Sequence, residues 1–312
     1  MPVDTPFPDP WILDEIARRF GLTAADAVPL PQGEANHVVH LGESLVLRVP
    51  RDDPDRIADL RKEADVIPVV RAAGVETPGL VAYDDGAALG VPFMVLERAG
   101  GVDLDRWPPG AAGIGQVYEA VGRQLARLHR IARSGTAGLI TVPVDHGDRD
   151  DPRHLLGPLV TEGLLDPATG AWLDGWFVEL AALRSPEPLR VLIHGDIAPR
   201  NLLADPATGR LTALVDWGDA AWADPAMDLA KLPLGQLDAV LTGYLPDERH
   251  DGARSVWRAR ALHYHLHWAV AAIGRRDPAT AQPLATGAAV ARLLAVLRAV
   301  IDTLDQGWRS PR

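Results

Sequence analysis

The polar side chains with the most specific spacing in this chain lie between residues 191 and 232. They are His194, Asp196, Asn201 and Asp216. The apolar runs VLI and LTALV directly precede His194 and Asp216, and each run predicts a short strand. We therefore expect two carboxylates and one amide to converge at strand ends and loops, around one metal–phosphate centre.

The chemistry that this spacing serves is phosphoryl transfer. In protein kinases the loop H-R-D-x-x-x-x-N supplies the aspartate that accepts the proton of the attacking hydroxyl, and its asparagine and a later aspartate hold magnesium ions. By this match Asp196 is the base, and Asn201 and Asp216 are magnesium ligands. His194 would stabilise the loop by hydrogen bonding, and Asp228 would tie the loop to the following helix. The alternative is a His-Gly-Asp turn that only caps a strand of another fold.

The segments HGDIAPRNLL and LVDWGDAAWADPAMDLA resemble the aminoglycoside phosphotransferase family, the small-molecule branch of the protein-kinase-like fold. The resemblance is strong over residues 191–232, reasonable over 45–101 and architectural elsewhere. It implies an α+β, two-lobed fold with a small β-rich N-terminal nucleotide-binding lobe over residues 1–98. Residues 99–312 would then form a larger, mostly helical lobe for catalysis and substrate binding.

The same resemblance implies an antibiotic-resistance kinase. Its phosphate donor would be ATP or GTP, its cofactor Mg²⁺, and its acceptor a hydroxyl of an antibiotic, with an aminoglycoside favoured. A macrolide, or a metabolite such as a sugar, a choline-like alcohol or homoserine, is the alternative acceptor. A non-catalytic nucleotide-binding protein is a second alternative, because the usual phosphate-binding lysine is missing and the nucleotide loop holds one glycine.

Nucleotide contacts are implied in two segments of the first lobe. The loop PQGEAN, residues 31–36, would lie over the phosphates and contribute Gly33 and Asn36, although an ordinary hairpin turn has the same pattern. The apolar run that ends in LERAGG, residues 91–101, would lead into the hinge between the lobes. There the main-chain groups of Glu97 and Ala99 would bind the purine.

Arg48, in the strand-like run LVLRV, is the candidate for gripping the nucleotide phosphates. Kinases usually have a lysine here, but the two lysines of this chain, Lys62 and Lys231, do not lie on such a strand. A guanidinium is always charged and can bind phosphate oxygens through two parallel hydrogen bonds, so the exchange is chemically tolerable. A solvated strand arginine is the alternative.

The helix partner of Arg48 is predicted to be Glu63, in the segment RIADLRKEADVIPVVRA of residues 56–72. Pro68 predicts a kink or an end in this helix, because an interior proline removes a backbone hydrogen bond. A surface Glu63 that pairs only with an i−4 or i+4 neighbour is the alternative.

The second lobe is expected to contain helices over residues 114–131 and 253–273. Between residues 133 and 160 the chain is rich in Gly, Pro and Asp. By the family resemblance, acidic residues here and in the C-terminal helices receive substrate ammonium groups, whereas a solvated acidic loop is the alternative for any single aspartate. In the pattern HYHLH only the outer histidines share a helix face, which favours packing in the core or cleft over a metal site.

Several absences narrow the class of protein. The chain has no cysteine, no G-x-x-x-x-G-K-[ST] phosphate loop and no apolar run that could span a bilayer. Its start, MPVDTPFPDP, lacks the features of a secretory signal. We expect a soluble cytoplasmic protein, a monomer or weak dimer that binds neither nucleic acid nor membrane. The net charge of −11 is compatible with a cationic small substrate.

Two features favour a small molecule over a protein as acceptor. Gly195 stands where protein kinases have the arginine that pairs with a phosphorylated activation loop. Moreover, only residues 217–224 separate Asp216 from Pro225, which leaves no room for an activation loop that holds a peptide. We therefore expect a small hydroxylated acceptor.

Overall fold

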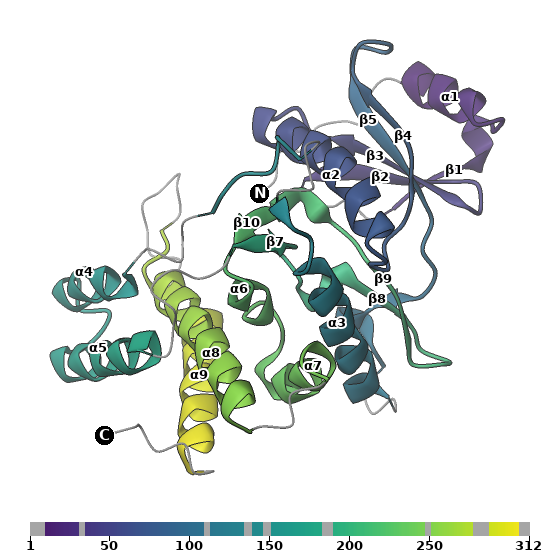
Figure 1. Ribbon diagram of the computed structural model, residues 1–312. Helices are drawn as coiled ribbons and strands as arrows, with labels where there is room; N and C mark the ends of the chain where they lie inside the picture. The colour runs from purple at the N-terminus through teal and green to yellow at the C-terminus, as the bar shows by residue number, and fades with distance from the viewer. Residues whose placement is uncertain are drawn as a thin grey trace.

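The computed structural model describes residues 10–30, 35–108, 113–133, 139–145, 151–182, 190–246, 251–276 and 287–305. Figure 1 shows two lobes, with strands β1 to β5 and helices α1 and α2 in one and a larger, mostly helical part in the other. The two-lobed α+β architecture that the sequence implies is confirmed.

The first lobe is built on a five-stranded antiparallel sheet in the order β1-β2-β3-β5-β4. Its strands are β1 (Ala27–Pro29), β2 (Asn36–Leu41), β3 (Leu45–Pro50), β4 (Leu80–Asp85) and β5 (Pro92–Glu97). Along β5, Phe93 and Val95 pack with the core of α1 (Pro10–Arg19), whereas Met94 and Leu96 pack with that of α2 (Pro54–Ala72). Arg48 of β3 lies opposite Met94, so it faces α2.

Helix α2 carries Glu63 beneath the sheet. It begins at an Asp53 cap, whose side chain accepts the Asp55 N–H at 2.8 Å, and Pro54 occupies its first turn. The helix continues to Ala72, so of the kink or end predicted at Pro68, the end is wrong. Pro68 is exposed, so its ring lies on the side of the helix that water reaches.

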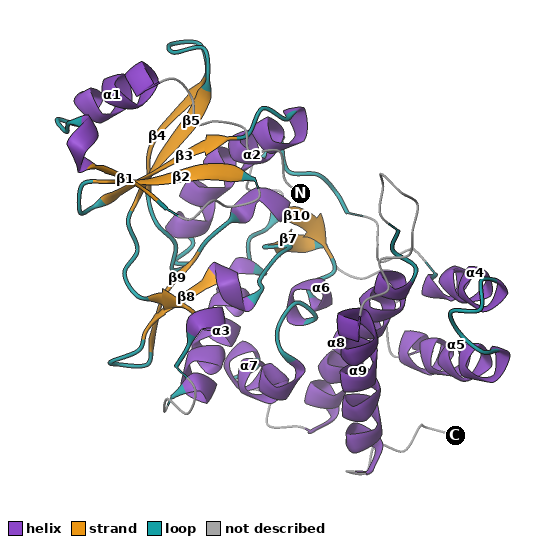
Figure 2. Cartoon of the chain, turned by 180° about the vertical axis from the view of Figure 1, so that it is seen from behind, coloured by secondary structure: helices purple, strands orange, loops and turns teal. Residues whose placement is uncertain are grey.

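The second lobe combines two small sheets with helices, as Figure 2 shows from behind. One sheet has the order β6-β8-β9, from Val102–Asp103, Leu202–Asp205 and Arg210–Leu214, and the other pairs β7 (Val191–Ile193) with β10 (Ala221–Ala223). The helices in the described ranges are α3 (Ile114–Leu128), α4 (Leu156–Thr161), α5 (Pro167–Ala182), α6 (Ala226–Leu229), α7 (Leu237–Tyr244), α8 (Asp251–Ile273) and α9 (Gly287–Asp305). The two helices predicted for this lobe are confirmed, although α3 ends at Leu128.

One hydrophobic core joins α2 to the second lobe. It contains Leu60 of α2, Val117 of α3, Val240 of α7 and the fully buried Trp217. Because this core is continuous, the segment after β9 is held against α2, and the two halves of the predicted site are brought together. Within the described residues, no helix has the length and apolar character needed to cross a membrane.

Candidate active site

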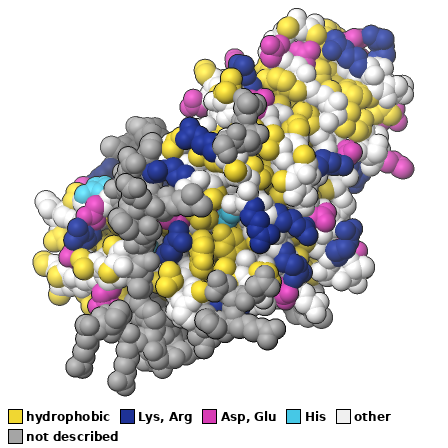
Figure 3. Space-filling model, in the orientation of Figure 1, with side chains coloured by type: hydrophobic (Ala, Val, Ile, Leu, Met, Phe, Trp, Pro, Cys, Tyr) yellow, Lys and Arg dark blue, Asp and Glu magenta, His cyan; other side chains and the backbone are white. Residues whose placement is uncertain are grey.

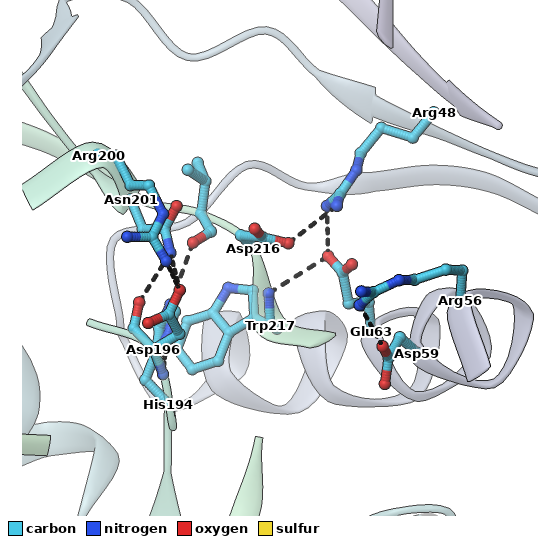
Figure 4. A network of polar contacts seen from close by, with 11 residues as sticks. Arg48, Arg56, Asp59, Glu63, His194, Asp196, Arg200, Asn201, Asp216 and Trp217 are labelled. Carbon is cyan, nitrogen blue, oxygen red and sulfur yellow. Dashed lines mark hydrogen bonds and ion pairs between the residues drawn. The ribbon is translucent and has the colours of Figure 1, made fainter. Parts of the chain in front are cut away.

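Strand β7 leads into the loop that carries Asp196 and Asn201, and a short 3-10 turn, Pro199–Asn201, closes it. The amide nitrogen of Asn201 donates to the Asp196 carbonyl at 2.7 Å and to Asp196 Oδ2 at 3.0 Å (Figure 4). Since the amide nitrogen points at Asp196, the amide oxygen of Asn201 faces the other way. The loop thus brings together the carboxylate and the amide that the sequence predicted to converge.

His194 is buried and uses both ring nitrogens inside the loop. Its Nε2 lies 3.1 Å from the Val215 carbonyl, and its Nδ1 accepts the Asp196 N–H at 3.3 Å. A carbonyl only accepts, so the ring proton lies on Nε2. Burial lowers the pKa of His194, which keeps the ring neutral. This geometry joins the loop to the end of β9 and directs neither nitrogen at a substrate.

Asp228 of α6 fixes the backbone at the start of the loop. Its carboxylate accepts the N–H groups of His194 and Gly195, each at 2.9 Å, and lies 3.0 Å from His129 Nε2. Burial alone would raise the pKa of Asp228, but the interactions with His129 and His194 together outweigh burial, and the pKa is lowered. The expected tie between the loop and the next helix is present, and it extends to the end of α3.

Gly195 is required by a close approach of two backbone segments. Its φ is +83°, and a Cβ atom on it would lie 2.0 Å from the Asp219 carbonyl oxygen. From the sequence alone, Gly195 is only the residue that stands in place of an arginine. The structure adds a physical reason, because the turn Trp217–Asp219 packs directly on this position.

We expect Gly195→Ala to lower the free energy of unfolding by about 3 kcal/mol or more, because it combines a left-handed backbone with a clash. Gly209→Ala is the matched control, since Gly209 has φ +65° but its Cβ would meet only the Gly113 Cα, at 3.9 Å. Strain alone should make the control less stable by about 1 kcal/mol. Urea unfolding measures both variants, and equal losses would contradict the close approach.

Asp216 has an unusual backbone conformation. Its φ is +73°, and no other non-glycine residue in the described ranges has a positive φ. Such strain is concentrated at functional sites in proteins. The Asp216 side chain is 47% exposed and lies 2.9 Å from Arg48 Nη2. Burial alone would raise the pKa of Asp216, but the charge and hydrogen bond of Arg48 outweigh it and lower the pKa, so the carboxylate is ionised.

The predicted contact between Arg48 and Glu63 is confirmed. Arg48 Nη1 lies 2.6 Å from Glu63 Oε2, and their side chains are only 12% and 2% exposed, so neither is a surface residue. Arg48 therefore bridges the α2 glutamate and Asp216, as Figure 4 shows. Burial raises the pKa of Glu63 to about 7, because the charge of Arg48 offsets the loss of hydration only in part.

The structure describes three of the four other residues that the sequence assigns to nucleotide binding. Gly33 lies outside the described residues. Asn36 begins β2 and is buried, and its Oδ1 has no hydrogen-bond partner among the residues that the structure describes. The Glu97 carboxylate binds Arg71 at 2.7 Å, and its N–H donates to the Gly79 carbonyl at 2.9 Å. Because the Glu97 N–H is already bonded, the main-chain group of Glu97 that a purine could contact is its carbonyl oxygen. Ala99 follows two residues later, in the segment that leaves β5.

Asn201 and Asp216 have the donor atoms that a magnesium site needs. Mg²⁺ prefers oxygen ligands, and it is usually held by one or two carboxylates together with substrate phosphates. The Asn201 amide oxygen faces away from Asp196, and the ionised Asp216 carboxylate is half exposed. These two residues therefore fit the ion that the family resemblance implies.

The acidic substrate contacts expected from residues 133–160 are only partly described. Residues 146–150, with Asp148 and Asp150, lie outside the described ranges. Asp145 is described and donates its N–H to the Trp222 carbonyl at 3.1 Å. Asp151 caps the following turn, and its carboxylate binds Arg153.

The histidines of α8 belong mainly to the second-lobe core. His263 and His265 are both buried, and the His263 ring packs edge-on against Phe177, with 5.9 Å between ring centroids. Burial lowers the pKa of His265 to about 3, so this ring is neutral. In the part of the chain that the structure describes, no group of three or more His, Asp or Glu side chains is placed to hold a metal.

Two cations beside Asp196 were missed in the sequence. Arg200 Nη2 binds Asp196 Oδ2, and Lys231 Nζ lies 3.6 Å from Asp196 Oδ1. Arg200 lies within the catalytic motif, so its proximity could have been inferred from the spacing. Lys231 follows α6 and reaches the loop only through the fold. Its one signal in the sequence is rarity, since the chain has only one other lysine.

Known proteins with similar sequences include phosphotransferases. The model of the phosphotransferase enzyme family matches residues 26–263. The chain is 29% identical over 185 residues to an aminoglycoside 3'-phosphotransferase of Streptomyces fradiae, covering 58% of this chain and 66% of that protein, about two thirds of its length. It is also 29% identical over 224 residues to a viomycin phosphotransferase of Streptomyces vinaceus, covering 64% of this chain and 70% of that protein.

A solved structure has a similar fold. The structure of APH(2")-IIIa in complex with GDP and kanamycin superimposes with a TM-score of 0.64 at 17% identity, covering 96% of this chain and 99% of that chain. At this identity the likeness establishes the fold alone. The family model spans most of the chain, and the loop motif, the strained Asp216 and the buried Arg48 pair lie within the matched residues. The chain belongs to the phosphotransferase enzyme family.

Proposed function

We propose that this protein is a small-molecule kinase that transfers the γ-phosphate of ATP or GTP to a hydroxyl of an antibiotic, with an aminoglycoside as the favoured acceptor. The observation that carries the proposal is the pairing of Asp196 with Asn201, next to an Asp216 that Arg48 bridges to Glu63. A base, two oxygen ligands and a buried cation where two lobes meet are the parts that phosphoryl transfer needs.

In this proposal the nucleotide binds between a first lobe of residues 1–98 and a second lobe of residues 99–312. The main chain at Glu97 and Ala99 contacts the purine, and the loop with Gly33 and Asn36 lies over the phosphates. The unpaired buried oxygen of Asn36 supports a ligand contact near this loop.

The phosphates are held from both lobes. Arg48 is permanently charged and binds phosphate oxygens in place of the usual lysine. Asn201 and Asp216 hold Mg²⁺, which neutralises charge on the phosphates when it is bound. Since Arg48 contacts Asp216 in this structure, the guanidinium and the metal site lie within one hydrogen bond of each other.

Asp196 acts on the acceptor. It orients the acceptor hydroxyl and takes its proton as the oxygen attacks the γ-phosphorus in line. The bond from the γ-phosphorus to the bridging oxygen breaks, and its electron pair stays with the nucleoside diphosphate. His194 and Asp228 keep the loop in place through the hydrogen bonds described above.

The acceptor class rests on the relatives and on the short segment that follows Asp216. Both relatives carry the names of antibiotic phosphotransferases, and the structural neighbour was solved with kanamycin. The short run between Asp216 and Pro225 supports a small acceptor over a peptide. The net charge of −11 gives little support for a cationic acceptor, because the charge is not evenly spread. Lys and Arg side chains gather near the middle of the face in Figure 3. We further propose a cytoplasmic enzyme that is a monomer or weak dimer.

A coupled assay of nucleoside diphosphate release tests the proposal, with a panel of aminoglycosides, viomycin, macrolides and hydroxylated metabolites. We expect release that depends on an aminoglycoside, and on Mg²⁺ because the site offers only oxygen ligands. Stimulation by a macrolide or a metabolite alone would replace the acceptor. Nucleotide binding without stimulation by any compound would favour a non-catalytic nucleotide-binding protein.

A further inference from the structure

Asp196 presents one carboxylate oxygen to its own loop and the other to a lysine from a different element. Oδ2 accepts hydrogen bonds from Asn201 and Arg200. Oδ1 faces Lys231 Nζ at 3.6 Å, which is too long for a hydrogen bond. Oδ1 is therefore the oxygen suited to take the proton of an acceptor hydroxyl, and Lys231 stands beside that point.

Lys231 is supported there by a packed aromatic platform. Its Nζ lies 4.9 Å from the centre of the Trp268 ring, within the range of a cation–π contact. The Trp268 ring packs on Tyr264 with 5.9 Å between centroids, and the Tyr264 hydroxyl donates to the buried Asp224 at 3.0 Å. Both rings belong to α8, which packs against α6 (Figure 1). The ammonium is thus positioned by the core of the second lobe.

The other cation on Asp196 is less constrained. The Arg200 side chain is 59% exposed, whereas that of Lys231 is 32% exposed. Lys231 is also one of two lysines among the 31 Lys and Arg residues of the chain. A lysine ammonium is a compact point charge with three donors, so it can reach phosphoryl oxygens without the width of a guanidinium.

We propose that Lys231 is the acceptor-side cation of the reaction, whose ammonium donates a hydrogen bond to the transferring phosphoryl group in the transition state. This inference rests on the proposed kinase function. An acceptor oxygen about 3 Å from Oδ1 has the γ-phosphorus about 3 Å away in a near-attack geometry. The phosphoryl oxygens then come within reach of an ammonium that is 3.6 Å from Oδ1.

The phosphoryl transfer needs no reactant other than the nucleoside triphosphate and the acceptor. The acceptor oxygen forms a bond to the γ-phosphorus, the bridging oxygen leaves with its electron pair on the nucleoside diphosphate, and the hydroxyl proton passes to Asp196. Lys231 stays protonated and neutralises charge on the phosphoryl oxygens in a partly enclosed site. Its contact therefore forms in the transition state and contributes little to the binding of either substrate.

Steady-state kinetics test this role through the split between kcat and KM. Lys231→Met is expected to lower kcat about 100-fold with little change in acceptor KM or nucleotide Kd. Lys231→Arg keeps the charge over Trp268 and should recover about tenfold of that loss. Lys62→Met is the matched control, because Lys62 pairs with Asp59 on α2 at 3.3 Å and should keep the wild-type kcat. A wild-type kcat for Lys231→Met, or only a raised acceptor KM, would overturn the proposal.

A second measurement needs no turnover. Reductive ¹³C-dimethylation labels Lys62, Lys231 and the terminal amine, and arginine substitutions at each lysine assign the signals. Adding Mg²⁺, ADP, aluminium fluoride and the acceptor forms a mimic of the transferring phosphoryl group. We expect the Lys231 signals to shift and the Lys62 signals to stay, and unmoved Lys231 signals would also overturn the proposal.

The two measurements separate this inference from the function on which it rests. If the wild-type protein transfers phosphate to no acceptor, the proposed function itself is contradicted. If the wild-type protein and the Lys231→Met variant are equally active, only the role of Lys231 is contradicted.

Discussion

Asp196→Asn is expected to lower kcat for acceptor phosphorylation about a thousandfold and to leave nucleotide binding unchanged. General-base catalysis typically contributes about 10²- to 10⁴-fold, and an amide cannot take the hydroxyl proton. The variant preserves the loop, because an asparagine oxygen can still accept the Asn201 amide N–H that now lies 3.0 Å from Asp196 Oδ2. Steady-state kinetics and calorimetric titration with nucleotide measure the two effects separately.

Asp205→Asn is the matched control for this loss. Asp205 ends β8, and its carboxylate accepts the Ala207 N–H at 2.9 Å and the Thr208 hydroxyl at 2.8 Å within an exposed turn. The same chemical change there should leave kcat as it is. A wild-type kcat for Asp196→Asn would remove Asp196 from the role of base, and a parallel loss of nucleotide binding would point to a damaged loop.

Arg48→Met is expected to lower the free energy of unfolding by about 3–5 kcal/mol above neutral pH and to weaken nucleotide binding. The Glu63 side chain is 2% exposed and would lose the guanidinium 2.6 Å away, which leaves a buried charge without its partner. The nucleotide would lose the cation that we assign to its phosphates. Urea unfolding and nucleotide titration measure the two losses.

The pH dependence of the Arg48→Met loss follows from Glu63. Burial raises the pKa of Glu63 to about 7 in the folded protein, from 4.5 for an unperturbed glutamate. Without Arg48 the folded pKa rises further, so the folded variant binds the proton more tightly than the unfolded chain does. Its stability therefore falls as pH rises from the unfolded pKa through the folded one. The loss should be smaller at pH 6 than at pH 8.

The double variant Arg48→Met with Glu63→Gln separates stability from nucleotide binding. It leaves no charge buried, so most of the stability should return while nucleotide binding stays weak. Arg48→Lys should keep both, because it restores the cation that kinases usually have. A double variant that binds nucleotide as wild type would contradict the assignment of Arg48 to the phosphates.

The parts of the site that follow from local spacing were predictable from the sequence. Asp196 and Asn201 lie on one short loop, and their contact follows from their separation along the chain. The pair of Arg48 and Glu63 was also predicted, because the order of strand and helix in the first lobe matches the family. The fold class followed from the same motifs.

Features that depend on long-range packing were not predictable in the same way. Helix α2 continues past Pro68 because that residue lies on the exposed side, and exposure is set by the sheet above the helix. The need for glycine at 195 arises from the carbonyl of Asp219, which approaches only after β10 pairs with β7. Lys231 reaches Asp196 through α6 and its contact with Trp268 of α8, and no local pattern encodes that distance.

The identity of the phosphorylated product tests the proposed kinase activity most directly. ³¹P NMR of wild-type protein with Mg²⁺, ATP or GTP and an aminoglycoside should show nucleoside diphosphate and a phosphomonoester on the acceptor in equal amounts. The same mixture with Asp196→Asn should show neither above the uncatalysed background. The proposed kinase activity would be contradicted if the products were nucleoside diphosphate and inorganic phosphate, with the acceptor unmodified. This result would have to hold for the aminoglycosides and for every other hydroxylated compound tried.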